Sequence, residues 1–186
     1  MPVVAVYDAC VLYPASLRDF LLRLAREGVV QPRWSDTILD EVFRNILFNR
    51  PALSAPALER TRSLMATAFP YARVEGYEGH ISGLHLPDAD DRHVLAVAVH
   101  AAAPVIVTFN LRDFPASVLD LLGITAVHPD DFVLERIAEG LAPVQSALRR
   151  QAEDLKRPPG TVDDVLARLQ TCGLPRTVAR LHAEKG

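Results

Sequence analysis

Residues 105–114 read Val-Ile-Val-Thr-Phe-Asn-Leu-Arg-Asp-Phe, and residues 3–8 form a similar segment, Val-Val-Ala-Val-Tyr-Asp. In both segments an apolar, largely β-branched run leads into polar or charged residues, as expected of a buried strand. Helical stretches alternate with strands along residues 1–133, which predicts an α/β fold with helices on both faces of a parallel sheet. Ligands of such folds bind at the carboxyl edge of the sheet, where Asp8 and Asp113 would lie.

The spacing of apolar residues predicts the helices between the strands. Ser35 is a good N-cap for one of them, and Gly28 and Pro70 follow the predicted ends of two others. We expect helices at residues 15–27, 35–48, 56–68 and 88–103, short strands at residues 72–75 and 124–127, and a loop at residues 76–86.

The segment after Pro129 has a different character, because no further strand is predicted there. Thr161 and Asp164 fit a capping box with Asp in place of the usual Glu. We expect four helices at residues 130–139, 144–156, 161–170 and 175–182. The sequence therefore predicts two parts, an α/β domain at residues 1–133 and an all-helical C-terminal extension at residues 134–186.

Composition restricts the class of protein. The net charge is −3, with 11 basic against 16 acidic residues at 1–133 and nine against seven at 134–186, so charge alone does not predict a nucleic-acid-binding surface. No apolar stretch has the length of a membrane span and no secretory signal is recognised, so we expect a cytoplasmic protein. Cys10 and Cys172 form neither a disulfide framework nor a zinc motif and are interpreted as small buried thiols.

Asp8 and Glu41 are the first candidates for a functional site. Asp8 directly follows the first predicted strand, although an Asx-turn at a strand end is an equally good explanation. Glu41 flanks the apolar stripe of its predicted helix, whereas Asp40 lies on the opposite face. A Glu whose stem covers apolar neighbours is the alternative for Glu41.

Three further acids crowd the start of the predicted helix at residues 88–103, where capping and the helix dipole explain acids well. Asp91 aligns with Leu95 on the core face of this helix, whereas Asp90 points away. We therefore expect Asp91 to bind a metal ion and Asp88 to cap the helix, with Asp90 as a substitute ligand.

The loop after the strand at residues 105–107 supplies a hydroxyl, an amide, a cation and a carboxylate within six residues: Thr108, Asn110, Arg112 and Asp113. A polar surface loop is the alternative, but this set follows the clearest strand in the chain. Carboxylates that converge at one sheet edge repel one another unless a cation lies between them, and their hard oxygen atoms suit Mg²⁺ or Mn²⁺. The pattern predicts a divalent-metal phosphodiesterase.

Four segments in this order resemble a PIN domain, and more narrowly the VapC-type ribonuclease toxins of bacterial and archaeal toxin–antitoxin pairs. The segments around Asp8, Glu41 and Asp91 resemble three of the family's acidic motifs. The segment Thr-Phe-Asn-Leu-Arg-Asp-Phe at residues 108–114 closely resembles its strand-exit motif, Thr-x-Asn-x-x-Asp-Phe. The resemblance covers roughly residues 1–133 and implies a three-layer α/β/α sandwich with a central parallel sheet.

The resemblance implies a metal-dependent endoribonuclease that leaves 5′-phosphate and 3′-hydroxyl ends. One or two Mg²⁺ or Mn²⁺ ions would be bound among Asp8, Glu41, Asp91 and Asp113. Thr108 and Asn110 would orient water or phosphate, and Arg112, with Arg44 or Arg50, would hold the RNA backbone. Two other classes stay open, namely a PIN-like binding module without activity and a metal-dependent phosphatase acting on small molecules.

The resemblance also implies a small antitoxin, which would insert an extended or helical segment into a hydrophobic groove. Two predicted helices carry more apolar residues than a single core-facing stripe needs. We expect the groove to be lined by Leu17, Phe20, Leu21 and Leu24 on the first helix and by Phe43, Ile46, Leu47 and Phe48 on the second. The alternative is that these residues pack inside the domain or in a homodimer, and for Phe20 and Ile46 we favour that alternative.

Overall fold

A computed structural model of the chain describes residues 1–156 and 159–184. Its centre is a four-stranded sheet in the order β2-β1-β3-β4, and all three strand pairs are parallel. The strands are β1 (Val3–Tyr7), β2 (Val30–Arg33), β3 (Val105–Val107) and β4 (Thr125–Val127). The two most apolar strands, β1 and β3, are therefore central and adjacent.

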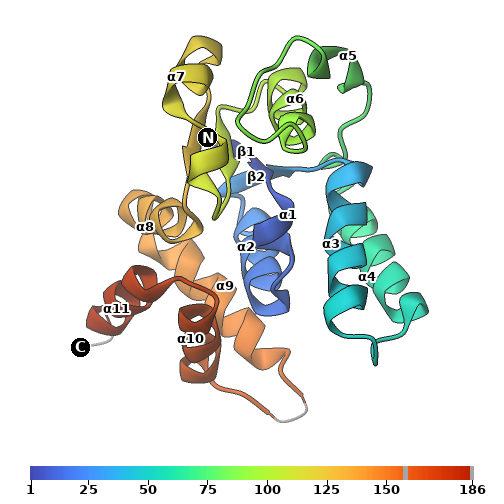
Figure 1. Cartoon of the computed structure of the whole chain (residues 1–186). Coiled ribbons are helices and arrows are strands. Elements are labelled where there is room, and N and C mark those ends of the chain that lie inside the picture. The colour runs from blue at the N-terminus through green and yellow to red at the C-terminus, as the bar shows by residue number, and fades with distance from the viewer. Residues whose placement is uncertain (157–158, 185–186) are drawn as a thin grey trace.

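Helices cover both faces of this sheet, as the sequence predicts. The helices are α1 (Ala9–Leu12), α2 (Ala15–Arg26), α3 (Asp36–Asn49), α4 (Ala55–Ala68), α5 (Glu78–Ile81), α6 (Arg92–His100), α7 (Ala116–Leu119), α8 (Pro129–Glu139), α9 (Leu141–Glu153), α10 (Val162–Thr171) and α11 (Pro175–Ala183). Figure 1 shows α6 above the strands and α2 below them, with α3 and α4 to one side. This arrangement confirms the predicted α/β sandwich with a helical C-terminal part.

Helices α9 and α10 pack directly against α2 of the sheet domain, and α11 packs on α8 and α10. Helix α9 lies along α2, where the Gln151 side-chain amide donates a hydrogen bond to the Ser16 carbonyl at 3.0 Å. Arg23 of α2 forms an ion pair with Asp154 at 2.8 Å, just beyond the end of α9. Helix α2 is thus enclosed between the sheet and the extension (Figure 1). The predicted division at residue 133 falls within α8 and stays a prediction.

Local capping signals are well reproduced. The Ser35 hydroxyl accepts a hydrogen bond from the Ile38 N–H at 3.2 Å and begins α3. Thr161 and Asp164 form the predicted capping box of α10.

Two other predictions are wrong. Residues 72–75 contribute only an isolated bridge between Arg73 and Trp34 instead of a strand, and the predicted loop at residues 76–86 contains the short helix α5.

The start of α6 also differs from the prediction. Asp88 does not cap the helix, because its carboxylate accepts a hydrogen bond from the Asp90 N–H at 2.8 Å and closes a local turn. The helix begins only at Arg92, and Asp91 occupies the N-cap position. The helix ends at His100 rather than Ala103, since Ala102 has a left-handed backbone with φ of 48°.

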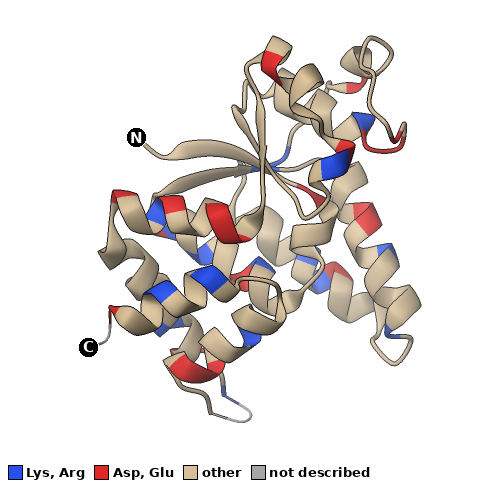
Figure 2. Ribbon diagram, turned by 60° about the vertical axis from the view of Figure 1, so that its left-hand side comes forward, with Lys and Arg blue, Asp and Glu red and all other residues tan. Residues whose placement is uncertain are grey.

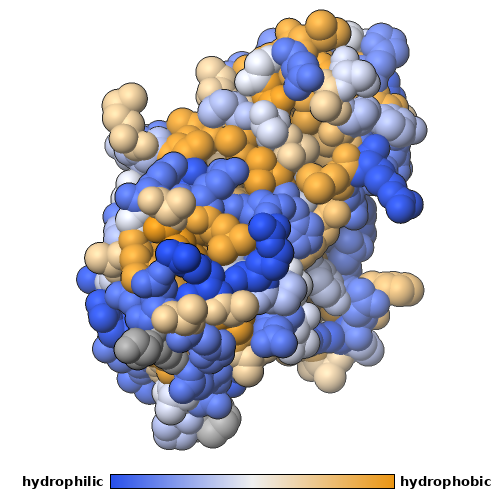
Figure 3. Space-filling view, turned by 90° about the vertical axis from the view of Figure 1, so that its left-hand side faces the viewer, coloured by the Kyte–Doolittle hydropathy of each residue, from blue (hydrophilic) through white to orange (hydrophobic). Residues whose placement is uncertain are grey.

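The surface combines charged and apolar residues. Figure 2 shows Lys and Arg interspersed with Asp and Glu over the helices. Figure 3 shows hydrophobic patches separated by hydrophilic residues on the side that carries α7, α8 and α11. Phe48, Tyr71 and Leu121 are the most exposed large apolar side chains after Met1. Among the described residues, none of the helices combines the length and apolar character needed to cross a membrane.

Candidate active site at the carboxyl edge of the sheet

The central strands bring Asp8 and Thr108 together. Tyr7 and Val107 are register partners at the ends of β1 and β3, and the Asp8 N–H donates to the Val107 carbonyl at 3.1 Å. The residue after each strand therefore lies at the same edge of the sheet. The Thr108 hydroxyl donates a hydrogen bond of 2.7 Å to Asp8 Oδ2, as the adjacency of the two strand ends allows.

Asp8 is held by three hydrogen bonds. Besides the Thr108 hydroxyl, the Ala9 N–H donates to Oδ1 at 2.7 Å and the Cys10 thiol donates to Oδ2 at 3.2 Å. The bond from Ala9 makes Asp8 the N-cap of the short helix α1. Burial raises the pKa of Asp8, because only 4% of the residue is exposed, and the three donors oppose that rise. Asp8 is thus a rigidly oriented carboxylate in a poorly solvated position.

Cys10 belongs to the same hydrogen-bond network. From the sequence alone, we predicted only a small buried thiol at this position. Its sulfur accepts a hydrogen bond from the Phe109 N–H at 3.3 Å and lies 3.4 Å from the Thr108 hydroxyl oxygen. Burial first, and the nearby Asp8 second, raise the pKa of the thiol to about 12, so Cys10 is a neutral donor near pH 7. Its position two residues after Asp8, in the first turn of a helix, is the sequence signal that could have revealed this role.

Asp91 carries the clearest electrostatic signal. It occupies the N-cap position of α6, but its side chain makes no capping hydrogen bond. Burial raises the pKa of its carboxyl to about 6, and repulsion from Asp8, Asp113, Asp88 and Glu41 adds to this rise. The four predicted acids therefore form one electrostatic cluster, to which Asp88 also contributes. Asp90 is exposed in the preceding turn.

Glu41 and Asp40 face in different directions, as the helical pattern of α3 predicts. Asp40 is exposed and forms an ion pair with Arg62 of α4. Glu41 instead faces α6, where one of its carboxylate oxygens lies 3.7 Å from Nε2 of His93. The sequence analysis did not identify His93 as a neighbour of the acids. Its position two residues after Asp91 is the sequence feature that could have indicated this.

The loop after Thr108 presents the remaining predicted residues. Asp113 is partly buried in the 3₁₀ turn η1 (Leu111–Asp113), and its N–H donates to the Asn110 carbonyl at 3.0 Å. Asn110 and Arg112 are exposed beside it. Thr108, in contrast, is fully buried, and its hydroxyl oxygen accepts the Asn110 N–H at 3.0 Å. Its hydroxyl is thus engaged with Asp8 and the loop.

The chemistry of this donor set fits a divalent cation. Four carboxylates whose charges repel one another, one of them with a pKa of about 6, favour a bound positive charge. Within residues 1–156 and 159–184, no three Asp, Glu, His or Cys side chains are already grouped closely enough to hold one metal ion. Mg²⁺ needs only one or two direct carboxylate ligands and otherwise keeps its waters, which is consistent with such an open arrangement.

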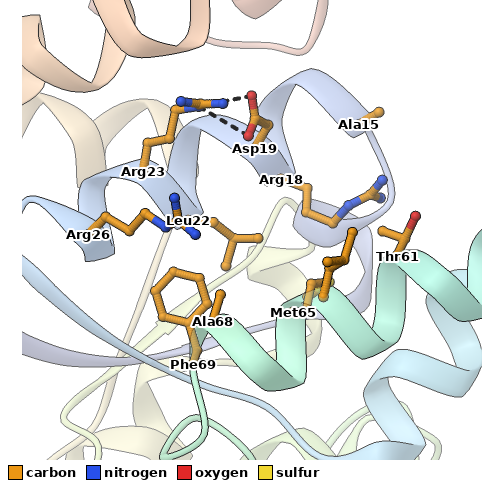
Figure 4. Close-up of a pocket in the computed structure, with 11 residues that line it drawn as sticks. Ala15, Arg18, Asp19, Leu22, Arg23, Arg26, Thr61, Met65, Ala68 and Phe69 are labelled. Atoms are coloured by element: carbon orange, nitrogen blue, oxygen red, sulfur yellow. Dashed lines mark hydrogen bonds and ion pairs between the residues drawn. The ribbon is translucent and has the colours of Figure 1, made fainter. Parts of the chain in front are cut away.

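A separate cleft of about 340 Å³ lies between α2 and α4. Figure 4 shows Arg18, Leu22 and Arg26 of α2 on one side and Met65 and Phe69 on the other. The predicted groove is wrong for four of its residues, because they are buried in the core: Leu17, Leu21, Leu24 and Phe43. Phe20 and Ile46 are also buried, as the favoured alternative for these two residues predicts. The opposite face of α2 forms the cleft instead. Leu47 is partly buried, and Phe48 is 85% exposed.

Comparisons with known proteins give three findings. A family model described as PIN domain matches residues 4–112, more than half of the chain, and one described as VapC50 C-terminal domain matches residues 129–183. A curated protein of Mycobacterium tuberculosis strain H37Rv, named "Putative ribonuclease VapC50", is 44% identical over 73 residues. This match covers 39% of the present chain and about 40% of the length of that relative. No solved structure matches the chain.

Proposed function

Since the chain belongs to the PIN domain family, we propose that it is a divalent-metal-dependent endoribonuclease and the toxin of a toxin–antitoxin pair. The observation that carries this proposal is the acid cluster, in which burial first, and repulsion from four other carboxylates second, raise the pKa of Asp91 to about 6. Such crowding is unfavourable for the protein alone, so a cationic ligand is its simplest explanation. The name of the M. tuberculosis relative, which contains the word ribonuclease, supports RNA as the substrate.

The residues that would hold Mg²⁺ or Mn²⁺ are Asp8, Glu41, Asp91 and Asp113, with Asp90 as a substitute ligand. When bound, the ion would neutralise charge on the phosphoryl oxygens and stabilise the leaving oxygen. The carboxylates would orient the water that attacks phosphorus. The structure favours a revised role for Thr108, since its buried hydroxyl donates to Asp8 and is not free to reach a substrate. We assign it to the positioning of Asp8.

Exposed groups around the cluster would hold the RNA. Asn110 and Arg112 lie in the loop that carries Asp113, and their exposure leaves them accessible to a phosphodiester backbone. Arg44 and Arg50 are exposed on and beside α3. Arginine suits this role, because its planar guanidinium can donate two hydrogen bonds to one phosphate.

Cleavage assays with two substrates test the reaction class. A mixed RNA pool and a chromogenic phosphate ester are each incubated with the full chain in Mn²⁺ or in EDTA. We expect Mn²⁺-dependent cleavage of the RNA, loss of cleavage in the Asp91→Asn variant and no hydrolysis of the ester. Preferred hydrolysis of the ester would identify a small-molecule phosphatase. Inactivity toward both substrates would favour a binding module.

The cleft between α2 and α4 is our proposed site for the antitoxin. Its apolar lining includes Leu22, Leu64 and Met65. Arg18 and Arg26 lie next to this lining (Figure 4), so the cleft suits an amphipathic segment with acidic side chains. Leu64 is 60% exposed and would be covered by such a segment.

Co-expression with the neighbouring open reading frame, followed by pull-down, tests this site. Leu64→Asp should abolish capture, whereas Phe48→Asp, outside the cleft lining, is the matched control. If only Phe48→Asp abolished capture, the partner surface would lie at the end of α3 instead. Light scattering of the wild-type chain and both variants tests the alternative that a homodimer covers these residues.

A further inference from the structure

His93 is a partly buried polar residue that the proposed chemistry does not yet use. It is the second residue of α6, two positions after Asp91, and its side chain is only 14% exposed. Nε2 lies 3.7 Å from the Glu41 carboxylate on α3, and Nδ1 is buried without a hydrogen-bond partner among the described residues. Unpartnered buried nitrogen atoms are rare in folded proteins and call for an explanation.

The surroundings select one tautomer of the imidazole ring. A lone pair on Nε2 would face the negatively charged carboxylate of Glu41 and be repelled by it. A proton on Nε2 is attracted instead, and Nδ1, which has no neighbouring acceptor, keeps its lone pair. At 3.7 Å the contact is longer than a hydrogen bond, but an approach of about 0.5 Å would form one, and such contacts commonly tighten when a ligand binds.

The orientation of the Glu41 carboxylate depends more on its contact with His93 than the orientation of Asp8 depends on any single hydrogen bond. Asp8 is oriented by three hydrogen bonds, whereas the 3.7 Å approach of His93 Nε2 is the one such polar contact of Glu41 among the described residues. The Glu41 side chain is also 38% exposed, so its rotamers are weakly restricted by packing. Without His93, little in the structure would keep this carboxylate directed toward the cluster.

We propose that His93 is a positioning residue, which holds the Glu41 carboxylate toward the acid cluster through the Nε2–H group. This inference rests on the proposed metal-dependent function. It gives the α6 segment two roles: Asp91 contributes a carboxylate to the cluster, and His93, two residues later, orients the carboxylate contributed by α3. Partners of this kind typically change metal affinity or activity by about 10–100-fold when they are removed.

Two amide substitutions of His93 distinguish the effect of the N–H donor from the effect of side-chain size. Glutamine places an N–H group near the position of Nε2, whereas asparagine places it near Nδ1. EDTA-treated full-length protein is titrated with Mn²⁺ alone, and the melting temperature gives the midpoint of binding. RNA cleavage then gives kcat and KM at limiting and at saturating Mn²⁺.

We expect His93→Asn to raise the Mn²⁺ midpoint about 10-fold or more. Its kcat should fall at limiting Mn²⁺ and recover at high Mn²⁺, with an unchanged KM for RNA, while His93→Gln stays close to wild type. Equal behaviour of the two variants, whether both weakened or both unchanged, would overturn the positioning role. A wild-type protein that neither responds to Mn²⁺ nor cleaves RNA would overturn the proposed function itself, which is a distinguishable result.

Discussion

Replacement of Asp91 by asparagine tests the acid cluster without any substrate. In the unfolded chain an aspartate loses its proton near pH 3.9, whereas in the folded protein Asp91 does so at about 6. Between these values the folded state binds more protons than the unfolded state, so wild-type stability falls as pH rises through this window. Asparagine does not titrate, and the variant should lack this loss.

The size of the effect follows from the pKa. A pKa higher by about 2 corresponds to about 3 kcal/mol if Asp91 were fully buried. Because Asp91 is only partly buried, solvent weakens both the cost of burying its charge and the repulsion from the other acids, and we expect about 1 kcal/mol at pH 7.5. For a protein of this size that difference raises the melting temperature by about 2–4 °C. In EDTA the variant should therefore be more stable than the wild type at pH 7.5.

Urea unfolding in EDTA between pH 4.5 and 7.5 measures this difference. It should be small at the acidic end and grow with pH. Asp90→Asn, at an exposed position, is the control and should stay within about 0.5 kcal/mol of wild type. In excess Mn²⁺ the order should reverse, because the wild type gains about 2.7 kcal/mol at 100 times the dissociation constant. A variant less stable than wild type in EDTA at pH 7.5, or a difference independent of pH, would refute the raised pKa of Asp91.

The other expected outcomes concern metal binding, the acids and the buried hydroxyl. Millimolar Mn²⁺ should raise the wild-type melting temperature in a saturable way that EDTA reverses, and an indifferent melting temperature would contradict a metal site. Glu41→Gln should reduce RNA cleavage by about 100-fold or more. Asp40→Asn should leave cleavage nearly unchanged, since Asp40 pairs with Arg62. Equal losses in the two variants would contradict the argument that only Glu41 faces the acid cluster. Thr108→Val should lower the free energy of unfolding by about 1–3 kcal/mol and slow cleavage, because Asp8 loses a donor. Thr108→Ser, which keeps the hydroxyl, should restore both, and failure to do so would assign Thr108 to packing.

Features that depend on neighbouring residues could be predicted from the sequence. The caps at Ser35 and Thr161 are formed within three residues, so their signals are complete in the local sequence. The cap expected at Asp88 was wrong although its signal was also local, because the carboxylate can close a turn with the Asp90 N–H as readily as it can cap a helix. Convergence of the acids was predictable from the strand ends and the PIN resemblance.

Features that depend on contacts between distant segments could not be predicted. The groove prediction failed at Leu17 and Leu21 because α2 is enclosed by the sheet and, on another side, by α9 of the extension. A helical pattern shows how many apolar residues there are, but not which elements cover them. For the same reason, the sequence did not reveal two neighbours of the acids. Cys10 meets Thr108 across 98 positions of the chain, and His93 faces a carboxylate on another helix.

The enclosure of α2 by α9 has a consequence for the order in which the protein is made. All four acids have been synthesised once the ribosome has added Asp113, whereas α9 is completed only at Glu153. At about 5–20 residues per second, the intervening 40 residues take roughly 2–8 seconds. During this interval the growing chain contains every proposed metal ligand but not the helix that completes the packing of α2. A chain released early would leave the α9-facing side of α2 uncovered and should therefore be degraded faster than the full-length chain.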